Sequence, residues 1–310
     1  MDNLNDKIEQ ITAEAAALGC YTEKDAILKD YTTFKIGGKC DLLVKLNGEE
    51  SFVKLIPLAE KLEVQYYIFG KGSNLIVDSN GITGIVFVSG KDFSEIKLID
   101  ETTIFCTAGT SLSTLCKFAY ENELTGLEFA YGIPGSLGGA VFMNAGAYGG
   151  EMKDVIESVK VMDVTGVISE YTADTLDFSY RHSRFTESGE IILSAVIKLK
   201  KGDKEQIKAQ MDDLMERRRS KQPLEYPSAG STFKRPEGSY ASLLIEQCGL
   251  KGVHVGDAEV STKHSGFVIN KGNADFSQLM ELIGIVKNTV KEKTGYVLEC
   301  EPLIISDKEL

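Results

Sequence analysis

The stretch GLEFAYGIPGSLGGAVFMNAGAYGG, from Gly126 to Gly150, carries eight of the thirty glycines of this 310-residue chain. Glycine loses the most backbone entropy on folding, so a dense cluster indicates turns with positive φ or close approach of a ligand to main-chain N–H groups. The segment Pro134–Ala140 leads into the apolar run AVFMNAG. We therefore predict a short helix starting there, with backbone donors that could attract phosphate. A glycine-rich packing turn explains the cluster equally well, so the cluster alone names no ligand.

The composition is that of a globular protein, with 43% hydrophobic and 26% charged residues. The length is sufficient for a sizeable core divided into two or three units. A net charge of −12 argues against a nucleic-acid surface, and no apolar run reaches membrane-spanning length. Residues 1–10 lack the features of a signal peptide, and the six scattered cysteines form no CxxC pair. We therefore expect a cytoplasmic protein with reduced thiols.

Hydrophobic periodicity predicts alternating helices and strands along the chain. The predicted helices cover residues 3–18, 48–62, 111–124, 203–222, 242–252 and 276–295. The predicted strands cover residues 64–70, 75–77, 84–89, 93–100, 102–109, 155–163, 166–171 and 190–200, a pair within 254–270, and a last one within 296–305. Two of the predicted helices have residues at helical spacing that would form one face. In helix 203–222 they are Ile207, Met211, Leu214 and Arg218, and in helix 276–295 they are the apolar residues at 276, 279, 283, 286 and 290.

The loop Gly70-Lys-Gly-Ser-Asn-Leu75 begins like a dinucleotide-binding fingerprint, since it follows a predicted strand. That fingerprint requires a third glycine and then a helix. Position 75 is Leu, and another strand follows, so we predict a tight turn between two strands instead. An ordinary β-turn, which Asn and Gly favour, is the alternative.

Seven motifs occur in a fixed order. They are TTFKIGG (32–38), GKGSNLIV (70–77), YGIPGSLGGAVFMNAGAYGGEM (131–152), FSYRHSRF (178–185), AGSTFKRP (229–236), VSTKHSGFVIN (260–270) and LECE (298–301). The series closely resembles the UDP-N-acetylenolpyruvoylglucosamine reductase family, of the shorter type without a long insertion, over about Tyr31 to Ile305.

The resemblance implies an α+β protein with an FAD-binding fold of the vanillyl-alcohol-oxidase (PCMH) type and a C-terminal α+β substrate-binding domain. The expected segments are 1–30, an N-terminal helix and lead-in; 31–200, an FAD-binding domain with subdomains of about 31–90 and 91–200; and 201–310, a connecting helix and the substrate-binding domain.

The resemblance also implies an activity. An FAD enzyme would use NADPH as co-substrate to reduce the enolpyruvyl ether of UDP-N-acetylglucosamine-enolpyruvate to UDP-N-acetylmuramate, in peptidoglycan precursor synthesis. We expect a monomer that binds neither nucleic acid nor membrane. Hydride addition leaves negative charge beside a carboxylate, so the site needs a cation and a proton donor.

The resemblance implies three catalytic residues. Arg181 would hold the substrate carboxylate, although spacing alone favours a surface arginine paired with Asp177 or Glu187. Ser231 would deliver the final proton, although a loop serine is usually a turn former. Glu301 would be the third, because the family's carboxylate aligns with it; Glu299 and Glu301 share one face of a strand, so periodicity does not separate them.

Substrate contacts are implied for Tyr180, Lys221 and His264. Cofactor contacts are implied for Gly70, Lys71, Gly72, Ser73, Asn74, Leu75, Gly132, Pro134, Gly135, Ser136, Gly138, Gly139, Asn144, Ala145 and Gly146. The last three would lie near the isoalloxazine ring or ribityl chain, and the glycine-rich segments would bind the pyrophosphate. We expect no metal, since the spacing of the three histidines does not fit zinc.

The chain departs from the family pattern at Pro302, Arg235, Ser242-Leu243 and Asp257. Two alternatives stay open, and the departures at Pro302 and Asp257 support only the second. One is another flavin oxidase or dehydrogenase on the same fold, acting on a different alcohol or sugar. The other is a nucleotide-sugar-binding regulator that has lost catalysis.

Overall fold

The computed structural model describes residues 3–308, which form two compact units built from non-consecutive segments. Unit 1 comprises Met1–Lys24, Leu42–Lys71 and Gly84–Glu216, and unit 2 comprises Asp25–Asp41, Gly72–Thr83 and Arg217–Leu310. This division differs from the three linear segments expected from the sequence. One physical reason is a pairing between segments far apart in the sequence, because β4 (Leu75–Val77) pairs in parallel with β18 (Leu303–Ile305).

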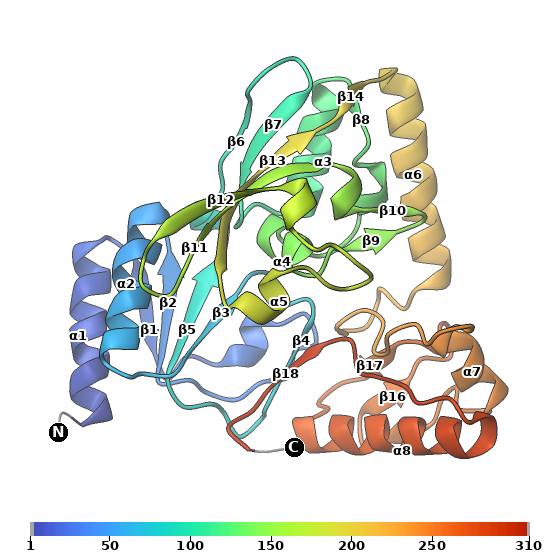
Figure 1. Ribbon diagram of the computed structural model, residues 1–310. Helices are drawn as coiled ribbons and strands as arrows, with labels where there is room; N and C mark the ends of the chain where they lie inside the picture. The colour runs from blue at the N-terminus through green and yellow to red at the C-terminus, as the bar shows by residue number, and fades with distance from the viewer. Residues whose placement is uncertain (1–2, 309–310) are drawn as a thin grey trace. The chain divides into compact units, whose positions relative to one another are not determined.

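Unit 1 contains a four-stranded sheet in the order β1-β2-β5-β3, in which β1 is antiparallel and the other pairs are parallel. Helices α1 and α2 lie side by side against β1 and β2 (Figure 1). The predicted helices and strands are confirmed here, and Pro57 lies inside α2 without ending it. The bounds are α1 Leu4–Ala17, β1 Tyr21–Lys24, β2 Leu42–Leu46, α2 Glu49–Lys61, β3 Tyr66–Phe69 and β5 Ile85–Ser89.

A second, five-stranded antiparallel sheet of unit 1 has the order β12-β11-β13-β7-β6. Its apolar residues share one core with those of the first sheet and its helices. The bounds are β6 Ile96–Leu98, β7 Thr103–Thr107, α3 Leu112–Glu121, β8 Leu124–Thr125, α4 Leu137–Phe142, β9 Gly146–Ala147, β10 Gly150–Glu151, β11 Ile156–Met162, β12 Ile168–Thr172, α5 Phe185–Ser188, β13 Ile191–Lys198 and β14 Lys200–Lys201. Short 3-10 turns cover Lys91–Phe93, Glu128–Ala130, Met152–Asp154 and Ala173–Thr175.

Helix α6 (Lys204–Lys221) continues from unit 1 into unit 2. Its predicted stripe is confirmed, since Ile207, Met211, Leu214 and Arg218 are all at most 6% exposed.

Unit 2 has its own apolar core and a three-stranded antiparallel sheet, β15-β16-β17, where the sequence predicted a pair of strands. Helices α7 and α8 lie against this sheet (Figure 1). All five predicted positions of α8 are buried, so its stripe is confirmed. The bounds are a 3-10 turn Leu28–Tyr31, α7 Ala241–Gln247, β15 His254–Val255, β16 Ala258–Val260, β17 Val268–Asn270 and α8 Phe276–Thr294.

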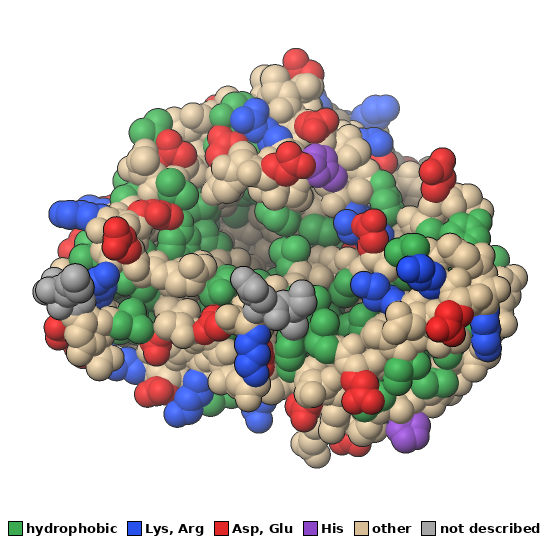
Figure 2. All heavy atoms as spheres, turned by 60° about the horizontal axis from the view of Figure 1, so that its bottom comes forward, with side chains coloured by type: hydrophobic (Ala, Val, Ile, Leu, Met, Phe, Trp, Pro, Cys, Tyr) green, Lys and Arg blue, Asp and Glu red, His purple; other side chains and the backbone are tan. Residues whose placement is uncertain are grey.

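The surface of the described residues is mixed in charge. On the face shown in Figure 2, Lys and Arg side chains are interspersed with Asp and Glu. Within residues 3–308, no helix combines the length and the apolar character needed to cross a bilayer.

Candidate active site

The loop Gly70–Leu75 follows β3 and precedes β4, as predicted for a turn between two strands. These strands belong to different sheets, and the chain passes from unit 1 to unit 2 within the loop. Gly72 has φ +62°, and a Cβ there would lie 2.1 Å from the Tyr31 carbonyl oxygen. The Thr33 N–H donates to the Gly72 carbonyl over 3.2 Å. The start of the TTFKIGG motif therefore packs against this loop, and only glycine fits at position 72.

The glycine cluster does form a helix start, with Ser136 as the N-cap of α4. The first donors of that helix are already used, however. The N–H of Leu137 donates to the Thr110 carbonyl over 2.8 Å, and that of Gly138 to the Ala108 carbonyl over 2.9 Å. The expectation that the donors at this helix start face a phosphate is therefore wrong, because the neighbouring segment 108–110 satisfies them.

Other backbone donors of unit 1 are unused. Within the described residues, the N–H groups of Gly70, Lys71, Gly132, Gly135 and Ser136 donate no hydrogen bond. Two of these segments touch, since a Cβ on Gly70 would lie 2.3 Å from the Ser136 hydroxyl oxygen. Adjacent unsatisfied N–H groups around bare backbone form an anion-binding nest. The residues present therefore fit the pyrophosphate of a dinucleotide cofactor such as FAD, with donors before the helix rather than in it.

The unit 2 part of the loop has the same property. Among residues 3–308, the N–H groups of Gly72, Ser73 and Asn74 also donate no hydrogen bond. The Asn74 side chain, unlike its backbone N–H, has a partner within the protein: its Nδ2 donates to the Glu301 carbonyl oxygen over 3.4 Å.

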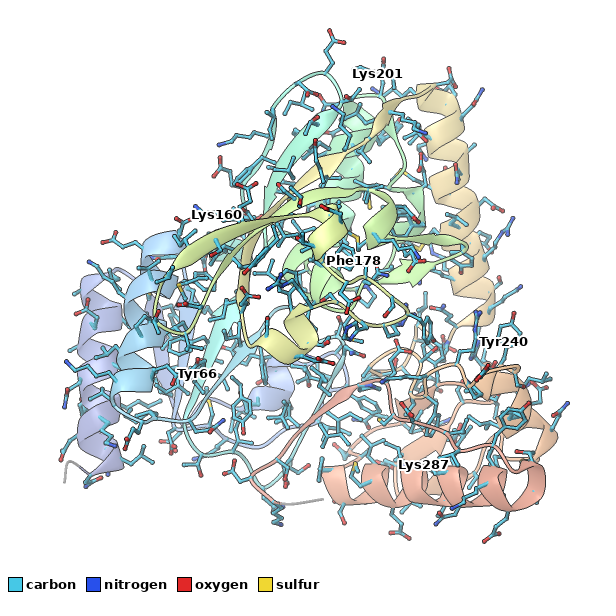
Figure 3. All side chains as sticks on the ribbon, in the orientation of Figure 1. Tyr66, Lys160, Phe178, Lys201, Tyr240 and Lys287 are labelled. Carbon is cyan, nitrogen blue, oxygen red and sulfur yellow. The ribbon has the colours of Figure 1, made fainter. Side chains whose placement is uncertain are left out.

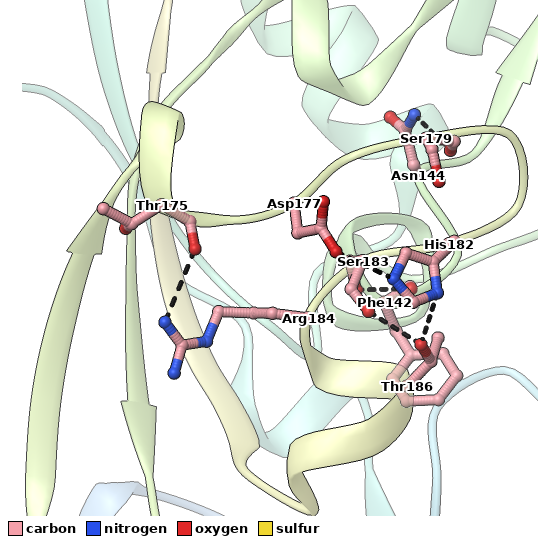
Figure 4. Close-up of polar contacts among 9 residues, drawn as sticks. All are labelled: Phe142, Asn144, Thr175, Asp177, Ser179, His182, Ser183, Arg184 and Thr186. Carbon is pink, nitrogen blue, oxygen red and sulfur yellow. Dashed lines mark hydrogen bonds and ion pairs between the residues drawn. The ribbon is translucent and has the colours of Figure 1, made fainter.

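Asn144 is 1% exposed, and its amide group is engaged within the protein. Its Nδ2 donates to Glu151 Oε2 over 2.6 Å. It also donates to the Ser179 carbonyl over 2.9 Å (Figure 4). Its Oδ1 accepts from the Lys153 N–H over 2.9 Å. The sequence did not indicate this internal role, and contacts of Asn144, Ala145 and Gly146 with a flavin stay a prediction.

Arg181 lies in a tight reverse turn in which the backbone groups of Ser179 and His182 pair with each other. Its φ of +56° is unusual for a residue with a side chain and costs about 1 kcal/mol. The guanidinium carbon lies 5.1 Å from the centre of the Tyr180 ring, which is 49% exposed. Arg181 Nη2 lies 3.5 Å from the Gly146 carbonyl oxygen. The turn therefore presents a cation and an aromatic ring together.

The flanks of this turn are anchored to unit 1 (Figure 4). The fully buried Ser183 hydroxyl donates to the Phe142 carbonyl over 2.7 Å. Arg184 stacks its guanidinium carbon 3.7 Å from the centre of the Tyr171 ring. Phe178 is partly buried against the core of this unit (Figure 3). Strain at Arg181 is therefore held by packing on both sides.

In unit 2, the segment that contains Ser231 pairs with the segment that contains Glu301, through an isolated bridge between Phe233 and Cys300. The Glu301 N–H donates to the Thr232 carbonyl over 2.9 Å. The Ser231 hydroxyl is half-buried and makes no hydrogen bond within residues 3–308. It is thus available to a ligand, as a proton donor must be.

The two acidic residues of LECE differ in environment. Both precede β18 rather than lying in it, beside an isolated pairing of Cys300 with Phe233. The Glu299 side chain is 72% exposed and lies 3.4 Å from the Lys234 ammonium. Glu301 is half-buried. Periodicity could not separate them, but their surroundings do, and the assignment of Glu301 stays a prediction.

Two predicted substrate residues lie elsewhere in unit 2. Lys221 is the exposed last residue of α6. The half-buried His264 ring stands edge-on to Phe267, with its Nδ1 accepting from the Gly266 N–H over 3.2 Å. Burial lowers the pKa of His264, helped by the nearby Lys251 charge. Their substrate contacts stay predictions.

Asp257, one of the departures from the family pattern, has a structural role. Its carboxylate accepts from the Asn273 N–H over 2.7 Å, and its carbonyl accepts from the Lys271 N–H over 2.8 Å. The substitution therefore holds a turn in unit 2.

A cavity of ≈ 300 Å³ in unit 1 contains none of the predicted site residues; it is lined in part by Glu49, Asp92 and Glu95. In the described part of the chain, no three His, Cys, Asp or Glu side chains gather as metal ligands. All six cysteines are free, and burial raises the pKa of Cys106 to about 12 and of Cys300 to about 11.

The fold and the donor-lined glycine loops define an FAD-binding flavoprotein. A family model described as "FAD binding domain" matches residues 40–172. A second, described as "UDP-N-acetylenolpyruvoylglucosamine reductase, C-terminal domain", matches residues 222–305. These matches confirm the predicted class, an α+β FAD-binding fold of the vanillyl-alcohol-oxidase type with a C-terminal α+β domain.

Relatives of nearly equal length identify the family. The UDP-N-acetylenolpyruvoylglucosamine reductase of Clostridium novyi is 47% identical over 306 residues, covering 99% of this chain and 97% of its own. That of Clostridium tetani is 47% identical, covering 92% of each chain. The crystal structure of the Thermus caldophilus enzyme matches with a TM-score of 0.79 and 35% identity, covering 93% of this chain and all of its own. The chain belongs to the UDP-N-acetylenolpyruvoylglucosamine reductase family, which confirms the resemblance.

Proposed function

We propose that this chain is an NADPH-dependent FAD enzyme that reduces UDP-N-acetylglucosamine-enolpyruvate to UDP-N-acetylmuramate in peptidoglycan precursor synthesis. The observation that carries the proposal is the backbone hydrogen bond from the Glu301 N–H to the Thr232 carbonyl, which links the segment that carries Ser231 to the segment that carries Glu301. Family membership supports the choice of substrate.

The cofactor would be held by backbone N–H groups of the loops at Gly70–Leu75 and Gly132–Ser136. FAD held there would supply the hydride chemistry that links NADPH to the vinyl carbon of the substrate. The protein's task is then to bind, orient and polarise the substrate, and to supply a proton.

Arg181 stabilises the negative charge that develops beside the substrate carboxylate. Its planar guanidinium suits a bidentate contact with a carboxylate, which lysine does not provide. The positive φ of the turn fixes the direction in which the side chain leaves the backbone. Tyr180 forms a flat wall beside the same cation, with its ring largely accessible.

Ser231 delivers the final proton to the enolate. A serine hydroxyl is a weak acid, so its neighbours must stabilise the transfer. We propose Glu301 as that neighbour, since its backbone N–H is hydrogen-bonded to the carbonyl of Thr232, the residue after Ser231. Lys221 and His264 would bind the UDP-sugar. We also infer a cytoplasmic monomer in which NADPH and substrate use one pocket in turn, with ping-pong kinetics.

An anaerobic visible-absorption titration of the purified protein tests the proposal. NADPH should bleach the flavin, and UDP-N-acetylglucosamine-enolpyruvate should restore its colour. A flavin restored only by oxygen would favour another oxidase or dehydrogenase. Tight UDP-sugar binding without NADPH consumption would favour a regulator that has lost catalysis. Intersecting double-reciprocal plots would contradict the ping-pong order.

A further inference from the structure

Two neighbouring hydroxyl residues of unit 2 have opposite surroundings. The Ser231 hydroxyl makes no hydrogen bond among the described residues. Thr232 is 1% exposed and is held by three hydrogen bonds of 2.8 to 2.9 Å. Buried polar groups are normally satisfied, so the engaged hydroxyl is the structural one and the free hydroxyl is the one left for a ligand.

The three hydrogen bonds of Thr232 join three separate segments. Its N–H donates to the Gly266 carbonyl over 2.8 Å, and its Oγ1 accepts from the N–H of Val268, the first residue of β17, over 2.9 Å. Its carbonyl accepts from the Glu301 N–H over 2.9 Å. The first two bonds fix the orientation of the peptide, and the third transmits that orientation to Glu301.

The Oγ1 bond has no substitute in the structure. Val268 is 1% exposed, so its N–H depends on Thr232 in place of water. Losing one partner of a buried pair leaves the other unsatisfied and drives a local shift of the backbone. Such a shift at Thr232 would move Ser231 by the chain and Glu301 by the hydrogen bond.

We propose that Thr232 is a positioning residue that holds Ser231 and Glu301 in register for protonation of the substrate. The inference rests on the proposed function. It assigns to Thr232 no contact with substrate or cofactor. The residue acts only through the geometry of its two neighbours, and a misplacement of about 1 Å can slow a reaction about 100-fold.

The test compares the two half-reactions of the FAD-loaded enzyme by anaerobic stopped-flow absorbance. Thr232→Val keeps the shape of the side chain and removes the acceptor, whereas Thr232→Ser keeps the acceptor. We expect Thr232→Val to slow flavin reoxidation by UDP-N-acetylglucosamine-enolpyruvate about 10- to 100-fold, with bleaching by NADPH unchanged. Thr232→Ser should restore reoxidation to near the wild-type rate.

Thr107→Val is the control in unit 1, because the buried Thr107 Oγ1 accepts from the Glu95 N–H over 2.7 Å and donates to the Phe93 carbonyl over 3.1 Å. It should lower thermal stability at least as much as Thr232→Val and leave both half-reactions intact. If Thr232→Val does not fold, Thr232→Ala removes the same acceptor and serves the same comparison.

Three results would overturn the inference and leave the proposed function standing. They are reoxidation of Thr232→Val at the wild-type rate, equal slowing of both half-reactions, and no rescue of reoxidation by Thr232→Ser. Failure of the wild-type flavin to be reoxidised by the enolpyruvyl sugar would overturn the proposed function, and the inference with it. A larger solvent deuterium effect on reoxidation in Thr232→Val would further support a protonation defect.

Discussion

Asn144 Nδ2 donates to the Ser179 carbonyl oxygen over 2.9 Å, which ties a fully buried amide to the turn that carries Arg181. Asn144 itself has φ +41°, and Arg181, two residues after Ser179, has φ +56°. Strained backbone persists only where the surroundings over-determine it, and it concentrates at functional sites. The pair therefore connects the glycine-rich segment to the proposed catalytic arginine.

Asn144→Ala should destabilise the protein by about 2 kcal/mol, because it leaves the buried partners of the amide unsatisfied. Substrate turnover should fall further than flavin reduction, since the Arg181 turn loses an anchor. Urea unfolding and the two half-reaction rates measure these effects. Asn122→Ala, which removes only a helix-end contact to the Phe118 carbonyl, is the control. Unchanged stability of Asn144→Ala would contradict the role of the amide.

Arg181→Gly should be more stable than Arg181→Ala by about 1 kcal/mol, because glycine adopts φ +56° without strain. Both variants should lose turnover by orders of magnitude, since neither carries the cation. Chemical denaturation and steady-state assays check the two parts separately. At the exposed Glu123, with φ +59°, the same Gly and Ala pair should reproduce the stability difference with activity retained. An active Arg181→Ala would instead favour another flavoenzyme activity.

Gly70→Ala should weaken FAD binding about tenfold or more, because the added Cβ would lie 2.3 Å from the Ser136 hydroxyl oxygen and displace the donor loop. Flavin fluorescence quenching during reconstitution of the apoprotein measures the affinity. Gly48→Ala is the control, since its φ is extended and a Cβ there would meet no atom within 4 Å. Equal FAD affinity of the two variants would remove Gly70 from the predicted cofactor site.

His264 should make the free energy of unfolding depend on pH. Burial lowers its pKa in the folded state, so below the ordinary value near 6.5 the unfolded chain binds more protons. The contribution is fully present above that value and is lost as the pH falls towards the folded pKa, with a slope of at most about 1.4 kcal/mol per pH unit. His264→Gln should flatten unfolding curves measured between pH 7 and 5. A steep slope retained in His264→Gln would assign the pH dependence to another group.

Local sequence patterns predicted individual helices, individual strands and the family of this protein. The spacing of Phe276, Leu279, Ile283, Val286 and Val290 predicts α8, because a helix brings such positions to one buried face. The ordered motifs identified the family and the FAD-binding class, since each motif is a short continuous segment. Ser136 as a helix start could also be read locally, from its position before an apolar run.

The tertiary structure alone decided which of these pieces meet. Leu75–Val77 pairs with Leu303–Ile305 at the far end of the chain, so the two units are discontinuous. The donors of Leu137 and Gly138 are taken by segment 108–110, and those before the helix are left for a ligand. Strand periodicity did not distinguish Glu299 from Glu301, and no sequence pattern gave Thr232 a role beside Ser231. Hydrogen bonds between distant segments depend on how the chain packs, and this is set by the summed burial of many residues rather than by any local propensity.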